Sequence, residues 1–202
     1  PIRAPWTETF GELLRELYTP EEAELITSMP YGMATLKRVA RTSGLDKDRL
    51  LPLLDGLCDK GLVMDIRAHG VTRYAVSPLV IGLFEFTMMR TGVGLDRKKL
   101  AGLFHASMSN EGAFYDGNVA HGEEMTIMRS VPHDGTLREG PYLEILDYEK
   151  ASEIVEGSDR FSMGLCSCRH EKHHLGDREC NVPLNNCSSF GVAADFLIRR
   201  NL

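Results

Sequence analysis

The sequence has few cysteines and few aromatic residues, and it contains no long hydrophobic run. Its 202 residues include five cysteines and a single tryptophan. An odd number of cysteines argues against the disulfide framework of a small secreted protein. The longest apolar stretch, residues 79–89, is interrupted by Gly82 and Glu85, whereas a membrane span needs roughly 20 apolar residues. No signal peptide is visible after Pro1, so we expect a cytoplasmic protein without a membrane partner.

Positive charge and catalytic signatures are also scarce. Lys and Arg number 23 against 29 Asp and Glu, which gives a net charge of −6. No global positive field therefore attracts nucleic acid or anionic lipid. The chain contains no glycine-rich phosphate loop, nucleophile elbow or HExxH sequence. Whether the protein is an enzyme stays open, and the sequence favours a component that does little bond chemistry itself.

The first third of the chain has the periodicity and capping residues of three helices followed by two strands. Thr19-Pro20-Glu21-Glu22 combines a threonine cap, an early proline and acidic residues at the positive end of a helix dipole. A leucine stripe follows Asp46, and His69-Gly70 is a typical turn dipeptide. The predicted elements are helices from Thr19 to Pro30, over residues 33–42 and from Asp46 to Gly61, then strands over residues 62–68 and 71–77.

Two helices joined by a short glycine turn, a third helix and a hairpin make a helix-turn-helix with a wing. Residues 17–78, which include LDKDRLLPLLDGLCDKGLV, resemble the winged-helix superfamily. The resemblance implies a fold more than a function. The expected fold class is α+β, with an N-terminal winged helix-turn-helix in residues 1–92 and a small α/β, cysteine-rich domain in residues 93–202.

The rest of the chain predicts a mixture of helices and strands. The predicted elements are helices over residues 79–90, 96–107, 148–157 and 188–200, strands over 124–132 and 160–168, an extended stretch over 141–146, and a loop over 108–121.

Four of the five cysteines fall within 22 residues, as Cys166, Cys168, Cys180 and Cys187. Thiolates are soft ligands that select zinc, copper(I) or iron–sulfur centres. In a strand the Cα atoms of a Cys-x-Cys pair lie roughly 6–7 Å apart on one face. One zinc ion would require the pair to bend, whereas the corners of an iron–sulfur cluster hold thiolates further apart. The spacing favours a cluster, and structural zinc and free or disulfide-prone thiols stay open as alternatives.

Two further features fit a cofactor in segment 161–202. Cys187 precedes the helix predicted over residues 188–200, so its sulfur would lie near free amides at the positive end of the dipole. Arg169 directly follows Cys168 and could donate a hydrogen bond to cluster sulfur.

Other titratable residues have simpler interpretations. His170, His173 and His174 could supplement cysteine ligands, but a solvated loop is the better interpretation. Cys58 lies in a leucine-rich helix and is expected to be a buried core thiol. The group formed by His121, Glu123 and Glu124 is better explained as a polar loop than as a metal site.

The segment predicted to act as a recognition helix, residues 46–60, carries more acidic than basic residues. A net acidic helix repels the phosphate backbone, although Lys37, Arg38, Arg41, Arg67 and Arg73 could still touch it. We therefore favour protein docking or homodimerisation through the winged helix over DNA binding.

The sequence CSCRHEKHHLGDREC, followed by NNCSSFGVAADFLIRR, resembles a family of bacterial and archaeal 4Fe-4S ferredoxin-type proteins. In that family a winged helix precedes a C-x-C-R…C…C segment. The resemblance implies that Cys166, Cys168, Cys180 and Cys187 bind one [4Fe-4S] cluster, with a redox protein or a further ferredoxin domain as partner. Electron transport is the expected function. The alternatives are a redox- or metal-responsive DNA-binding regulator and a structural zinc-binding protein.

Overall fold

A computed structural model describes residues 4–90, 94–110, 113–118 and 151–202 of the chain. Within these residues the protein combines helices with two small antiparallel sheets, as expected for the α+β class. None of the described helices combines the length and the hydrophobicity that crossing a membrane would require.

The caps predicted at Thr19 and Asp46 and the glycine stop after the second predicted helix are confirmed, but that helix begins at Leu36 instead of residue 33. A further helix, α1 (Glu8–Leu17), precedes α2 (Pro20–Ser28). In α2 the Thr19 side chain accepts from the Glu22 amide and the Glu22 carboxylate accepts from the Thr19 amide, which forms a complete capping box. Helix α3 (Leu36–Ser43) ends at Gly44, whose φ of 71° suits glycine, and Asp46 caps α4 (Lys47–Asp59).

A three-stranded sheet follows these helices and has the strand order β1-β3-β2. Strand β1 (Ala34–Thr35) precedes α3, and β2 (Val63–Ala68) and β3 (Val71–Val76) form the hairpin predicted from the sequence. His69 and Gly70 both have positive φ, as a tight two-residue hairpin turn requires. The register places Asp65 of β2 opposite Tyr74 of β3.

The continuous helix predicted over residues 79–90 is wrong in its first half. The segment Leu79–Leu83 contains the extended Val80 and the left-handed Ile81, and only α5 (Phe84–Met89) is regular. The Glu85 carboxylate accepts a hydrogen bond from the Gly82 amide at 2.8 Å. The Glu85 side chain thus provides an acceptor for an amide that has no partner within a helix, and α5 begins two residues later at Phe84.

The middle of the chain is more helical than its polar composition suggested. Helix α6 (Arg97–His105) matches its prediction, and the predicted loop over residues 108–121 is wrong where α7 (Ala113–Asn118) forms. Helix α8 (Ala151–Glu156) lies within its predicted range. The strand predicted over residues 124–132 and the extended stretch over 141–146 lie outside the described residues, as do His121, Glu123 and Glu124.

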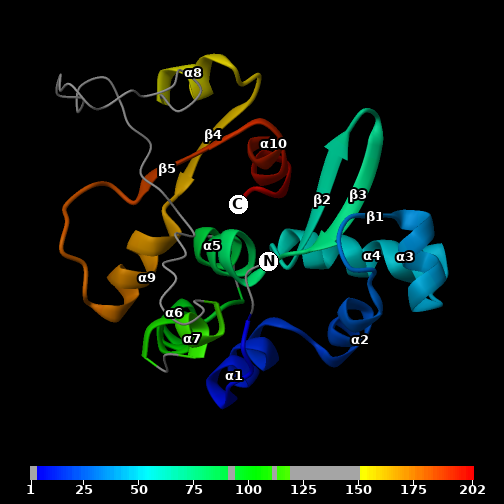
Figure 1. The fold of residues 1–202 in the computed structure, drawn as a ribbon, viewed down its shortest axis with the longest axis horizontal. Helices are drawn as coiled ribbons and strands as arrows, with labels where there is room; N and C mark the ends of the chain where they lie inside the picture. Colours follow the sequence, from blue (N-terminus) through cyan, green and yellow to red (C-terminus); the bar gives the residue numbers. More distant parts are fainter. Residues whose placement is uncertain (1–3, 91–93, 111–112, 119–150) are drawn as a thin grey trace.

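The C-terminal part is a two-stranded ribbon with two helices. Its elements are β4 (Phe161–Leu165), α9 (Ser167–Leu175), β5 (Asn185–Phe190) and α10 (Gly191–Arg200). Strands β4 and β5 pair antiparallel. Figure 1 shows α10 between this ribbon and the β2–β3 hairpin, and α10 contacts both.

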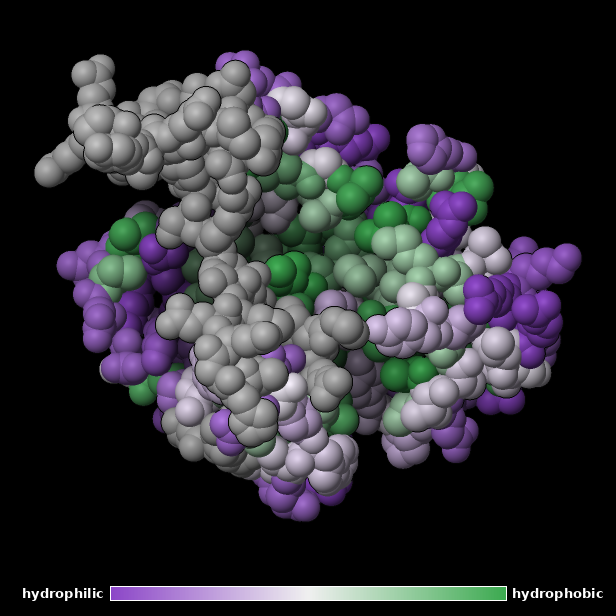
Figure 2. All heavy atoms as spheres, viewed as in Figure 1, coloured by the Kyte–Doolittle hydropathy of each residue, from purple (hydrophilic) through white to green (hydrophobic). Residues whose placement is uncertain are grey.

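The main core extends across the boundary expected at residues 92 and 93. Leu13, Leu54, Met88 and Phe104 all belong to one buried cluster. Phe84 and Phe104 meet edge to face, with ring centroids 5.2 Å apart. Figure 2 shows hydrophobic residues gathered at the centre of this face of the molecule. The described parts of residues 4–90 and 94–110 therefore share apolar packing.

Candidate functional site

The cysteine segment is positioned by the ribbon and by helix α9. The chain leaves β4 at Cys166, whose amide donates to the Leu184 carbonyl at 2.7 Å, and it then enters α9. Cys187 lies in β5 opposite Gly164 of β4, two residues before Cys166. Segments separated by about twenty residues in sequence therefore meet at one end of the ribbon.

Two sequence-based placements of these cysteines are wrong. The strand predicted over residues 160–168 ends at Leu165, so Cys166 is the N-cap residue of α9 and Cys168 lies in its first turn. Cys187 lies within β5 instead of directly before a helix, because α10 begins only at Gly191. The positive end of the α9 dipole is consequently near Cys166 and Cys168.

Arg169 joins two of the four predicted ligands. Its Nη1 donates to the Cys166 Sγ and its Nε donates to the Cys180 Sγ, both at 3.4 Å. Its Nη1 also lies 3.5 Å from the Asn186 Oδ1. One guanidinium therefore brings together the start of α9, the loop that carries Cys180 and the start of β5.

The other two cysteines do not contact Arg169 in any hydrogen bond of the described chain. The Cys168 residue is exposed and Cys187 is half-buried. Desolvation of the sulfur raises the pKa of Cys168, the Ser167 hydroxyl lowers it, and the charges of Cys166, Glu85 and Cys187 raise it. Burial raises the pKa of Cys187, and the charges of Cys166 and Glu85 add to this effect.

Cys180 differs from its neighbours because its thiolate form is stabilised. The hydrogen bond from Arg169 lowers the pKa of Cys180, and a hydrogen bond from the Val182 amide lowers it further. Cys180 therefore has the most acidified thiol for which a shift is resolved in the described chain.

The donor set determines which kind of centre could be held here. Within the described ranges, no three His, Cys, Asp or Glu side chains lie close enough together to hold a single metal ion. A tetrahedral zinc site with Zn–S bonds of about 2.3 Å needs its sulfurs about 3.8 Å apart. Arg169 joins two thiols, and a set of thiolates spread more widely than this would suit a multinuclear centre better than one zinc ion.

The histidines near the cysteines are structural. The solvated loop predicted for them is wrong, since all three lie in α9. His170 is buried, and its Nδ1 donates to the Met88 carbonyl at 2.7 Å. Its Nε2 lies 2.9 Å from the Nε2 of His174, which makes a hydrogen bond between two neutral rings. These contacts fix α9 against α5.

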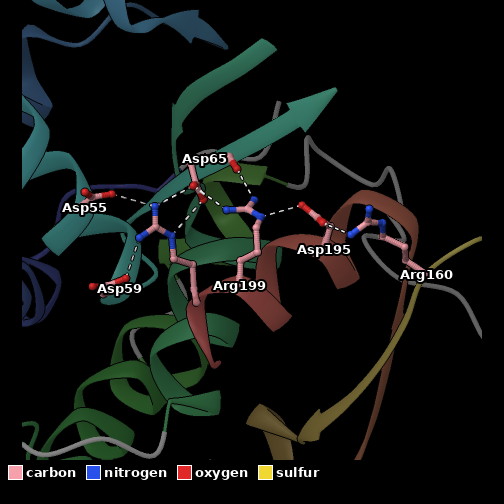
Figure 3. A network of polar contacts seen from close by, with 7 residues as sticks. Asp55, Asp59, Asp65, Arg160, Asp195 and Arg199 are labelled. Carbon is pink, nitrogen blue, oxygen red and sulfur yellow. Dashed lines mark hydrogen bonds and ion pairs between the residues drawn. The ribbon is translucent and has the colours of Figure 1, made fainter. Parts of the chain in front are cut away.

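Helix α10, which follows Cys187, is anchored to the N-terminal half by ion pairs (Figure 3). Asp65 is only 2% exposed, and its Oδ2 accepts from both Arg199 and Arg200 at 2.7 Å. Burial alone would raise the pKa of Asp65, but the hydrogen bonds from Arg200 and Arg199 lower it.

The same arginines reach residues beyond β2. Arg200 pairs with Asp59 at 2.8 Å and Asp55 at 3.1 Å, both on α4, while Arg199 pairs with Asp195 of α10. Asp195 also pairs with Arg160, which precedes β4. A continuous line of charges therefore connects α4, β2, α10 and the beginning of the ribbon (Figure 3).

Sequence reasoning missed Glu85, Asp65, Arg199 and Arg200. One signal was available: Asp65 occupies an inward position of an alternating strand, between Val63 and the turn, where an apolar residue is expected. The prediction for Cys58 is confirmed. Its side chain is fully buried, and this burial raises its pKa to about 12.

Comparison of the chain with protein-family models, curated proteins and solved structures finds no match.

Proposed function

We propose that the protein is a cytoplasmic iron–sulfur protein that binds one [4Fe-4S] cluster through Cys166, Cys168, Cys180 and Cys187. Such a cluster supplies a one-electron couple. The protein would act as an electron-transfer component and dock onto a redox partner. The contact of Arg169 with both Cys166 and Cys180 supports the proposal, together with the positions of Cys168 in the first turn of α9 and Cys187 in β5.

Arg169 has a defined role in this proposal. It donates to Cys166 and Cys180, and hydrogen bonds to thiolates offset their negative charge. The first turn of α9 adds amides without a side-chain cap. Both features stabilise the added negative charge of a reduced centre, so both raise its reduction potential relative to a site without them.

The N-terminal half supports a winged helix-turn-helix that serves as a docking module. The element order α2, β1, α3, α4, β2, β3, together with the strand order β1-β3-β2, has the pattern of that fold. Arg200 forms ion pairs with Asp55 and Asp59 on α4, so this side of α4 contacts α10 within the molecule. A role in protein docking suits this arrangement better than insertion of α4 into a DNA groove.

Electron transfer is tested by loading the full chain with iron and sulfide under anaerobic conditions and titrating it with dithionite. We expect reversible bleaching of visible absorption, a paramagnetic signal in the reduced form, and reoxidation by a one-electron viologen dye. Arg169→Gln should lower the midpoint potential, whereas Lys172→Gln, on the same helix and paired with Asp177, should not. A loaded protein with no reversible couple would contradict the proposed function.

A second candidate function is a redox-responsive regulator, and the ion pairs of α10 favour it. Loss of the centre would loosen β5, which leads directly into α10, and would release Arg199 and Arg200 from Asp65. A gel shift with random duplex DNA at low salt, using loaded and unloaded protein, separates the two functions. Binding in only one state would support the regulator, and no binding in either state would remove it.

A further inference from the structure

A cavity of about 600 Å³ lies between α1, α2 and the end of β3, far along the chain from the cysteines. Its volume falls within the range of small-molecule sites, about 300–1,000 Å³. The walls are mainly apolar, and no side chain of the described residues fills the space between them. The main wall residues are Trp6, Phe10, Leu14, Tyr18, Ile26 and Leu79.

Most polar side chains in the wall have partners inside the protein. Thr19 accepts from the Glu22 amide, Thr27 donates to the Glu24 carbonyl, and Ser77 donates to the Gly61 carbonyl. The hydroxyl hydrogens of Thr27 and Ser77 are used in these bonds, whereas the Thr19 hydroxyl keeps its hydrogen. The side-chain donors that the wall offers a ligand are therefore Tyr18, Arg15 and the Thr19 hydroxyl.

Tyr18 and Arg15 are two donors in the cavity wall at the C-terminal end of α1. Arg15 lies in the last turn of the helix, and Tyr18 is the extended C-cap residue that follows it. The Tyr18 hydroxyl makes no hydrogen bond with another described residue, and burial raises its pKa, so it remains a protonated donor at neutral pH. Within the part of the chain that the structure describes, Arg15 pairs only with Glu8, at 3.5 Å, and both side chains are largely exposed, so this pair is weak.

We propose that the cavity binds a small apolar monocarboxylate. Its hydrocarbon part lies against Phe10, Leu14 and Ile26. Its carboxylate accepts from the Tyr18 hydroxyl and the Arg15 guanidinium at the mouth. An uncharged hydrocarbon would leave both donors unused, whereas a carboxylate pairs the guanidinium and also satisfies a desolvated phenol. This inference does not depend on the cysteine site.

The only tryptophan of the chain forms part of the wall, so it reports directly on occupancy. Trp6 meets Phe10 edge to face, with ring centroids 6.4 Å apart. Its ring also lies over Gly11, where an added Cβ would stand 3.0 Å from the Trp6 Cζ2. Glycine at position 11 is what allows the indole to lie this close to α1.

The test is a titration of the full chain with decanoate, decanol and butyrate, monitored by Trp6 fluorescence below the aggregation concentration of each probe. We expect saturable binding of decanoate, at least about tenfold weaker binding of decanol, and no saturation with butyrate. Tyr18→Phe and Arg15→Gln should each weaken decanoate about tenfold and leave decanol unchanged, because each removes one hydrogen bond to a charged group.

Ala23→Phe is the blocking variant. Ala23 lines the cavity from the exposed side of α2, so the larger side chain fills the space without disturbing the core. It should abolish the decanoate response while the melting temperature is retained.

Equal binding of decanoate and decanol by the unmodified protein would overturn the carboxylate assignment. A decanoate response that survives Ala23→Phe would place binding elsewhere. A dimer in sedimentation velocity that Ala23→Phe dissociates would show that a second copy occupies the groove, and it would also overturn the proposal.

Discussion

Arg169 donates from its Nε to the Sγ of Cys180 at 3.4 Å, and this contact joins the first turn of α9 to a loop eleven residues further along the chain. A guanidinium beside a thiol favours the thiolate. The pKa of Cys180 is accordingly lowered, while the pKa values of Cys168 and Cys187 are raised by burial.

Arg169→Gln should therefore slow the alkylation of Cys180. In the metal-free protein, the midpoint of its pH–rate profile should shift upward, toward the ordinary thiol value of about 8.5. Peptide mass spectrometry after a short iodoacetamide pulse would follow Cys180 separately from the other thiols. Lys172→Gln is the matched control, since Lys172 pairs with Asp177 instead. Identical profiles in the unmodified protein and Arg169→Gln would show that the contact does not acidify Cys180.

Cys168 and Cys58 should respond in opposite ways to the same substitution. Cys168→Ser removes one of the four proposed ligands and should lose the bound iron. Cys58→Ser should retain it, because Cys58 is fully buried in the main core. The measurement is the iron content per chain of the two variants after anaerobic loading. Equal iron loss in the two variants would contradict the assignment of Cys58 to the core alone.

Asp65 should contribute more to stability than its single negative charge suggests. Asp65→Asn removes the one buried carboxylate that the largely buried Arg199 and Arg200 share, and we expect a loss of about 3 kcal/mol in the free energy of unfolding. Asp177→Asn, which breaks an exposed pair with Lys172, should cost less than about 1 kcal/mol. Urea denaturation at pH 7 measures both values, and equal losses would contradict the importance of the network.

The same network has a predictable pH dependence. The pKa of Asp65 is lower in the folded protein, so its stabilising contribution is fully present above the unfolded value of about 3.9. The contribution is lost as the pH falls through the folded pKa. The stability difference between the unmodified protein and Asp65→Asn should thus be constant from pH 5 to 7 and shrink below about pH 4. A difference that grows on acidification would contradict this account.

Two glycines with similar backbone angles should differ in their tolerance of alanine. Gly44 and Gly61 have φ of 71° and 75°, so alanine costs about 1–2 kcal/mol of backbone strain at either position. Only at Gly61 would the new Cβ collide with a neighbour, since it would lie 2.3 Å from the Phe86 Cβ. We expect Gly61→Ala to lose at least about 3 kcal/mol, judged by thermal and urea unfolding. Equal costs would show that Phe86 moves freely.

Local chemistry was enough to predict α2, the end of α3, α4 and the β2–β3 hairpin, although it missed α1 and β1. The cap at Thr19, the glycine at position 44, the cap at Asp46 and the His69-Gly70 turn each act within a few residues. Such signals can be read in one pass along the chain because the interactions that decide them are local.

The cysteine segment could not be predicted in the same way. Helix α9 has no apolar stripe, and its position depends on the bond from buried His170 to the distant Met88 carbonyl. Strand β5, with the sequence NNCSSF, is polar and gains its extended form by pairing with β4. Tertiary contacts decided both elements, and local propensity gave no indication of them. The structure joins Cys166 and Cys180 through Arg169, and a centre shared by all four cysteines stays a prediction.

The most direct test of the central proposal is the iron, acid-labile sulfide and zinc content of the full chain purified without oxygen. The account predicts about four iron and four sulfide per chain, negligible zinc, and loss of both iron and sulfide in Cys180→Ser. Stoichiometric zinc without sulfide, in protein whose four cysteines are all reduced, would contradict it.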